Sequence, residues 1–169
     1  MTELLPDQVI DEDRFRRALA LHAAGVVVVT ATSGGAPAGL TATSFSSVSL
    51  APPLVSFYVA HTSTTWPSLR AAQRFAVNIL SSGQADLATR FALRGVDRFA
   101  APTRWRPAAD GTPLLEGVCA HLLCTPHTTI DIGDHVLVVG RVTGVEVRDP
   151  GDPLLYHRGR FGDFHPQTP

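Results

Sequence analysis

The stretch from residue 37 to residue 60, PAGLTATSFSSVSLAPPLVSFYVA, constrains the fold of this chain more than any other. It contains two strand-like runs, residues 44–50 and 54–59, which are joined by Ala51-Pro52-Pro53. Small and hydroxyl-bearing residues fill the segment from Gly39 to Ser44, and such residues leave room for a ligand to approach the backbone. The stretch therefore predicts a pocket at the rim of a sheet.

The composition is typical of one folded domain. A chain of 169 residues can bury a substantial core, so we expect a single domain over residues 1–169 with flexible tails at 1–12 and 163–169. A content of 44% hydrophobic and 17% charged residues disfavours disorder. The net charge of -1 gives no reason to expect a nucleic-acid partner. The sequence shows neither a signal peptide nor a run of about 18 apolar residues, so we expect a cytoplasmic protein without a membrane segment.

Short turns separate most of the strand-like runs, which predicts antiparallel neighbours. The expected strands are residues 26–32 (buried on both faces), 44–50, 54–59, 75–80, 118–130, 135–148 and 154–164. The expected helices are residues 14–21 after a cap at Asp11 or Asp13, a short helix from Thr65 with Pro67 in its first turn, and residues 84–93. Residues 95–117 are expected to form a long loop. This pattern predicts a mainly β fold with short helices, in which an antiparallel barrel carries a ligand site at its mouth.

The metal-ligand residue types Cys119, His121, Cys124 and His127 lie close together in the sequence. On an extended strand, at roughly 3.3 Å per residue, they spread over about 26 Å, and Cys124 faces away from the others. A tetrahedral site needs all of its ligands around one ion. We therefore expect no metal.

Two nucleotide-binding motifs are also disfavoured. Residues 34–41 resemble a phosphate-binding loop, but Leu40 stands where that loop needs a lysine, and the segment continues as a strand. The sequence contains no G-x-G-x-x-G between a strand and a helix. We expect neither nucleotide hydrolysis nor a Rossmann site.

Polar residues at predicted strand and helix ends are candidates for a ligand site. His135 follows Gly133-Asp134 at the start of a strand, where the carboxylate of Asp134 can orient the imidazole; the alternative is a surface histidine beside an ordinary turn. The hydroxyls of residues 63–65 lie at a predicted helix start, where they can bind a phosphate or simply cap the helix. Arg94 and Arg98 are candidate counter-charges for such a phosphate.

The remaining signal is the order and spacing of short segments between residues 14 and 162. These segments are 39–45 (GLTATSF), 47–50 (SVSL), 52–54 (PPL), 75–80 (FAVNIL), Gln84, Leu87-Ala88, Phe91, Gly133-Asp134-His135 and 153–156 (PLLY). Together they resemble the flavin reductase family, whose members include the small reductase components of two-component monooxygenases.

The resemblance implies an FMN-binding split β-barrel, antiparallel and Greek-key-like, that works as a homodimer. It also implies reduction of FMN or FAD by NADH or NADPH, with the reduced flavin passing to a partner monooxygenase. His135 matches a position on the nicotinamide side, and we expect it to orient the nicotinamide or a flavin edge. The residues that match flavin-binding positions are Thr41, Ala42, Thr43 and Ser44 at the ring and ribityl chain, Ser63, Thr64 and Thr65 at the phosphate, and Phe91, Arg98, Tyr156 and Phe161 near the same cleft.

Two other functions stay open on the same residues. One is a split-barrel flavoprotein that keeps its FMN tightly bound and acts on another electron acceptor. The other is a flavin carrier or electron-transfer module without catalysis. The Gly133-Asp134-His135 turn favours the reductase, because a carrier has no need of a nicotinamide site. Hydride transfer between stacked rings needs mainly orientation from the protein, which agrees with the lack of a recognisable nucleophile motif.

Overall fold

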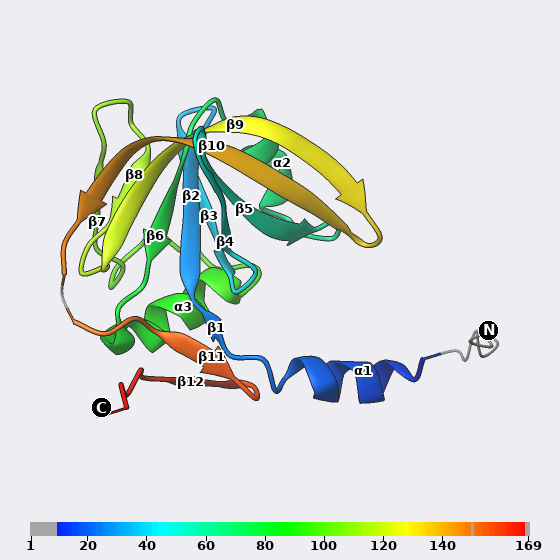
Figure 1. The fold of residues 1–169 in the computed structure, drawn as a ribbon. Coiled ribbons are helices and arrows are strands. Elements are labelled where there is room, and N and C mark those ends of the chain that lie inside the picture. Colours follow the sequence, from blue (N-terminus) through cyan, green and yellow to red (C-terminus); the bar gives the residue numbers. More distant parts are fainter. Residues whose placement is uncertain (1–9, 150, 168–169) are drawn as a thin grey trace.

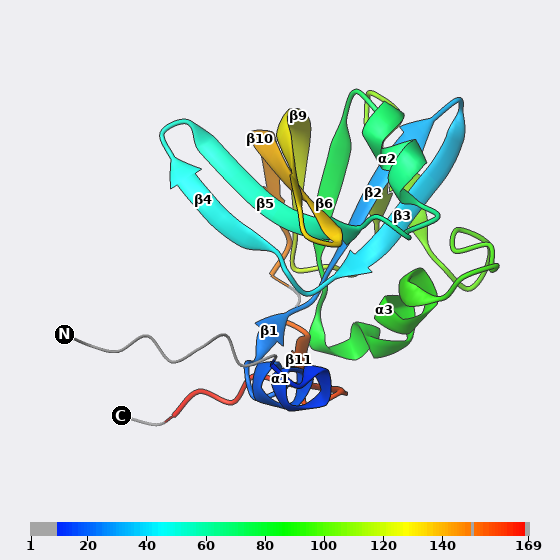
Figure 2. The same ribbon diagram turned by 90° about the vertical axis from the view of Figure 1, so that its right-hand side faces the viewer.

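A seven-stranded antiparallel sheet that curls toward a barrel forms the centre of the computed structural model, which describes residues 10–149 and 151–167 (Figure 1). Across the sheet its strands are β3 (Ala36–Ala42), β2 (Val27–Ser33), β6 (Phe75–Ile79), β9 (Ala120–Ile132), β10 (His135–Val147), β5 (Pro53–Ala60) and β4 (Ser46–Leu50). The two edge strands, β3 and β4, follow one another in the chain, so the barrel is split between them (Figure 2). The predicted mainly β, antiparallel fold is confirmed.

Glycine-containing turns set the hairpins of this sheet. Gly34 and Gly35 have φ angles of +58° and +79°, which glycine adopts at little cost, and they connect β2 to β3. Gly133, with φ +57°, connects β9 to β10. The chain also pairs strands that are distant in sequence, β2 with β6 and β5 with β10, which gives the expected Greek-key-like connections.

The core has two parts, one on each face of β2. Val27 and Val29 pack inside the barrel with Phe57 and Phe75, whereas Val28 faces the second part. That second part lies beneath α3 (Ala85–Ala92) and contains Leu80, Phe91 and Leu115. The alternation follows the two-residue period of a strand, and it confirms the prediction that this run is buried on both faces.

Within residues 10–149 and 151–167 the structure has three short α-helices, and each has different surroundings. α1 spans Glu12–Leu19 after the Asp11 cap, whose carboxylate accepts a hydrogen bond from the Arg14 amide at 2.7 Å. It begins two residues before the predicted start, buries none of its residues and lies away from the barrel (Figure 1). α2 (Trp66–Ala71) packs near β2, and α3 follows the single 3₁₀ turn η1 (Ser82–Gln84).

Two predicted segments differ from the structure. Residues 95–117 were expected as a loop but contain a hairpin, β7 (Trp105–Pro107) with β8 (Pro113–Leu115). Buried polar side chains hold it: Thr30 donates to the Pro113 carbonyl at 2.5 Å, and Asn78 accepts from the Leu115 amide at 2.9 Å.

The C-terminal segment, expected as one strand, is a hairpin of β11 (Leu155–His157) and β12 (Arg160–Gly162) that pairs with β1 (Ala24–Gly25). Its turn consists of Arg158 and Gly159, both with positive φ.

The predicted flexible tails fall largely outside the described residues, which exclude 1–9 and 168–169. Glu12 belongs to α1, and residues 163–167 have no regular secondary structure. Within residues 10–149 and 151–167, no helix has the length and apolar character needed to cross a membrane.

Candidate functional site

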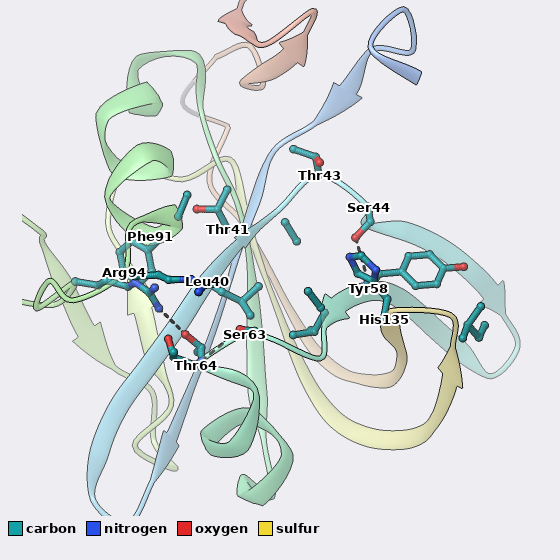
Figure 3. Close-up of a pocket in the computed structure, with 17 residues that line it drawn as sticks. Leu40, Thr41, Thr43, Ser44, Tyr58, Ser63, Thr64, Phe91, Arg94 and His135 are labelled. Carbon is teal, nitrogen blue, oxygen red and sulfur yellow. Dashed lines mark hydrogen bonds between the residues drawn. The ribbon is translucent and has the colours of Figure 1, made fainter. Parts of the chain in front are cut away.

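A cavity of about 700 Å³ lies where the barrel is split. Its walls come from the end of β3 and the residues that follow, the end of β5 with residues 63–65, the end of α3, and the tip of the β9–β10 hairpin (Figure 3). All of the predicted site residues except Tyr156 and Phe161 line it: Thr41, Ala42, Thr43, Ser44, Ser63, Thr64, Thr65, Phe91, Arg98 and His135. The structure thus brings together segments that lie up to 94 residues apart (135 − 41) in the sequence.

The hydroxyls of residues 41–44 mainly connect the cavity wall to its neighbours. Thr41 donates to the Ala88 carbonyl of α3 at 2.6 Å, and the Ser44 oxygen accepts from the Tyr58 amide of β5 at 2.9 Å (Figure 3). Thr43 is exposed at the rim, and its hydroxyl makes no hydrogen bond within the part of the chain that the structure describes. This segment is therefore fixed on both sides and offers Thr43 to a ligand.

Residues 63–65 form the opposite wall. Thr65 is the residue before α2, as predicted, but its buried hydroxyl does not cap the helix; it accepts a hydrogen bond from Arg98 Nη1 at 2.5 Å. The Ser63 oxygen accepts from the Thr65 amide at 3.3 Å. Thr64 is exposed beside them.

Two arginines line the cavity in different ways. Arg94 is exposed, and its Nη2 donates to the Thr62 carbonyl at 3.4 Å, close to the limit for a hydrogen bond. Arg98 is half-buried and binds carbonyls and a hydroxyl of the protein itself. Burial lowers the pKa of Arg98. Arg94 is therefore the cation with more freedom to meet an anionic ligand.

His135 is the first residue of β10, and its Nδ1 lies 2.6 Å from a carboxylate oxygen of Asp134. Asp134 is therefore placed to orient this imidazole, which was one of the two interpretations of the Gly133-Asp134-His135 turn. The hydrogen bond from His135, followed by the charge of the imidazole, lowers the pKa of Asp134. The His135 side chain is 42% exposed and lines the cavity, while its Nδ1 lies against the Asp134 carboxylate.

Six cavity residues were not predicted from the sequence: Leu40, Tyr58, Val59, Ala60, Ala92 and Ile132. Tyr58 was detectable in principle, because it alternates with the buried Phe57 along β5 and so faces the opposite side. Ile132 and Ala60 enter the site because both pair with His135 across the sheet. Strand register of this kind has no local sequence signal.

Tyr156 and Phe161 lie elsewhere in the single chain. Their rings are 5.3 Å apart on the β11–β12 hairpin, where they pack against the second part of the core. Phe161 lines a separate cavity of about 670 Å³ together with Arg158 and Arg160. The structure does not bring this pair to the cavity of Figure 3.

The cysteines and histidines of β9 are dispersed. His121 is buried with its Nε2 2.8 Å from the Leu115 carbonyl, and Cys124 is buried inside the barrel, where desolvation raises its pKa to about 12. Within residues 10–149 and 151–167, no group of three or more potential ligands is placed to hold a metal ion.

Comparison with known proteins gives a consistent result. A family model described as "Flavin reductase like domain" matches residues 19–165. The NADH:FMN oxidoreductase of Rhodococcus qingshengii is 44% identical over 151 residues, covering 87% of this chain and 79% of that protein.

Two solved structures are also similar. Nitrilotriacetate monooxygenase component B from Mycobacterium thermoresistibile superimposes with a TM-score of 0.88 and 39% identity, covering 94% of this chain and 90% of the other. The Streptomyces globisporus NADH:FAD oxidoreductase SgcE6, in complex with NAD and FAD fragments, has a TM-score of 0.87 and 37% identity, with coverage of 96% and 99%.

Proposed function

This chain belongs to the flavin reductase family, and on that premise we propose that its cavity binds a flavin which NADH or NADPH reduces. The protein is an NAD(P)H:flavin oxidoreductase that uses FMN or FAD. The observation that carries the assignment is the cavity itself, which joins apolar, hydroxyl and cationic walls in one site. Its volume of about 700 Å³ is in the usual range for sites that hold cofactors.

The residues present fit a flavin. Tyr58 and Ile132, which are exposed and line the cavity, supply apolar surface for a ring. Thr43 supplies an exposed hydroxyl for the ring or the ribityl chain. Ser63, Thr64 and Arg94 supply hydroxyls and a positive charge for the phosphate. These residues would hold a flavin, which when bound would supply the ring that accepts hydride from NADH or NADPH.

We propose that His135 orients the nicotinamide or a flavin edge at the opposite wall. Asp134 holds Nδ1, so the imidazole keeps one orientation and presents Nε2 to the cavity. Orientation contributes to the rate because the reacting rings must stack before hydride can transfer. A His135→Ala variant that keeps both the KM for NADH and the hydride-transfer rate would contradict this role.

We also propose that the protein works as a homodimer. Large apolar side chains are exposed on α1, β4 and the tip of β9, and the Leu50 side chain is 93% exposed. Patches of this kind mark interaction surfaces. Ile132 belongs both to the exposed set and to the cavity wall, so a second copy that covers this surface would border the flavin site. Sedimentation velocity tests the dimer directly.

The reduced flavin is proposed to serve a monooxygenase. The similarity to nitrilotriacetate monooxygenase component B supports a partner of this class. Addition of a candidate oxygenase and its substrate should convert flavin-dependent NADH oxidation into substrate hydroxylation.

The experiment that tests the function measures oxidation of NADH and of NADPH with FMN, with FAD and without added flavin. Turnover that depends on added flavin is expected. The same experiment shows whether NADH or NADPH is the better hydride donor and whether FMN or FAD is the better acceptor. Turnover without added flavin by a yellow purified protein would favour the tightly bound flavoprotein. Flavin binding without any turnover would favour the carrier.

A further inference from the structure

Arg98 joins three elements of the cavity wall through one guanidinium. Its Nη1 donates to the Gly39 carbonyl of β3 at 2.7 Å and to the Thr65 hydroxyl before α2 at 2.5 Å. Its Nε donates to the Leu93 carbonyl after α3 at 3.0 Å, and its Nη2 donates to the same carbonyl. A guanidinium has five N–H donors, and these four hydrogen bonds leave it little capacity for a phosphate.

Arg98 also separates two cavities. A second cavity of about 250 Å³ lies on the far side of the guanidinium and is lined by Gly39, Asp97 and other residues. Thr64, Thr65 and Arg98 line both this cavity and the larger one. The wall at this end of the larger cavity is therefore built from Arg98 and the two threonines.

We propose that Arg98 is a positioning residue: it fixes the separation between residues 41–44 and residues 63–65, and it does not bind the flavin phosphate. The inference rests on the proposed function, because it concerns the flavin site. Gly39 precedes the first segment by two residues, and Thr65 belongs to the second, so the Arg98 bonds connect the segments directly. Arg94, which has more freedom in this structure, contacts the phosphate instead.

Comparison of FMN with riboflavin, which lacks the phosphate, distinguishes a residue that positions the cavity wall from one that binds the phosphate. Dissociation constants for both ligands are measured by fluorescence titration of wild type, Arg98→Lys and Arg94→Gln. Arg98→Lys is expected to weaken both ligands on the order of tenfold, with the FMN-to-riboflavin ratio unchanged, because a lysine cannot make the forked contacts. Arg94→Gln is expected to weaken FMN about tenfold and leave riboflavin unchanged.

Arg90→Lys is the matched control. Arg90 lies on α3 and donates to the Ala101 carbonyl, but it does not line the flavin cavity, so both affinities should stay at the wild-type level. Hydride transfer is then measured at saturating FMN and NADH, per flavin-binding site. Arg98→Lys should slow it several-fold, whereas a general loss of stability would reduce only the number of binding sites.

A selective loss of FMN affinity in Arg98→Lys, with riboflavin affinity kept, would overturn the inference. If Arg98→Lys does not fold, Thr65→Val removes one acceptor of the same guanidinium and should weaken both ligands equally; a loss confined to FMN would again contradict the role. Failure of the proposed function gives a different result, since wild type would then either bind neither flavin or bind flavin without oxidising NADH or NADPH.

Discussion

The two halves of the seven-stranded sheet, its covered side and its exposed side, differ in whether the chain covers their apolar side chains. On the side of β3, β2 and β6, the chain covers its own sheet with α2 and α3, and residues such as Phe91 are fully buried. On the side of β4, β5 and the tip of β9, apolar side chains alternate outward and stay exposed, as Leu50 and Ile130 do. The flavin cavity lies at the boundary between these sides (Figure 3). The difference teaches that one wall of the site is built by the fold of the protomer, whereas the other lies beside the surface at which we propose that a second copy binds.

Replacement of one apolar residue on each side should give the largest contrast. Phe91→Ala removes a fully buried ring from the covered side and is expected to lower the free energy of unfolding by about 3–5 kcal/mol. Ile130→Ala, on the exposed side, should change it by less than about 1 kcal/mol in dilute protein. Urea unfolding measures both. Equal losses would mean that the two sides do not differ.

Gly39→Ala tests how closely α3 approaches the covered side. A Cβ at Gly39 would lie 2.8 Å from a ring carbon of Phe91 and 3.0 Å from the Val29 carbonyl oxygen. We expect a loss of about 1–3 kcal/mol in stability, together with weaker FMN binding, because the ring must shift at the cavity wall. Denaturant unfolding and flavin titration measure these effects. Gly83→Ala, where a Cβ would meet nothing within 4 Å, is the control.

Leu50→Ser tests the exposed side. Loss of this apolar contact is expected to weaken the proposed dimer about tenfold, or about 1.4 kcal/mol, with little effect on the protomer. Sedimentation equilibrium gives the association constant. An unchanged association constant together with a large loss of protomer stability would show that Leu50 packs within its own chain.

The smallest expected effect is a pH dependence on the covered side. Desolvation lowers the pKa of His121 below its ordinary value of 6.5, and this outweighs the Leu115 carbonyl and the Glu146 charge, which raise it. The unfolded chain therefore binds the proton more tightly, so stability falls as pH drops through 6.5 and levels off below the lowered pKa of the folded state.

His121→Gln should remove this part of the pH dependence. Urea midpoints at intervals from pH 7 to about pH 5 compare it with wild type. Parallel profiles of the two proteins would exclude His121 as the source.

Much of the site could be predicted where the signal is local. The hydroxyls of residues 41–44 and 63–65 and the turn before His135 are recognisable from residue types and their order. Their convergence in one cavity supports that analysis. The double burial of β2 also followed from its uninterrupted run of valines.

The structure differs from the predictions where contacts between residues distant in sequence determine the local structure. The β7–β8 hairpin is held by Thr30 and Asn78, which are far away in sequence, so its own residues read as a loop. The resemblance assigns Tyr156 and Phe161 to the flavin cleft. In the single chain they pack against the second part of the core, on the hairpin that pairs with β1, and their role in the site stays a prediction. The Thr65 hydroxyl was a candidate helix cap, because nothing local in the sequence shows that it accepts a hydrogen bond from Arg98 instead.

The exposed rim of the cavity has a consequence for the fate of the product. Thr43, Thr64 and Arg94 all face solvent around the opening. A reduced flavin bound beside this exposed rim would be free to leave and would also be accessible to dioxygen. Release to an acceptor and wasteful reoxidation therefore compete, and the yield of useful electrons per NADH depends on how near and how abundant the acceptor protein is.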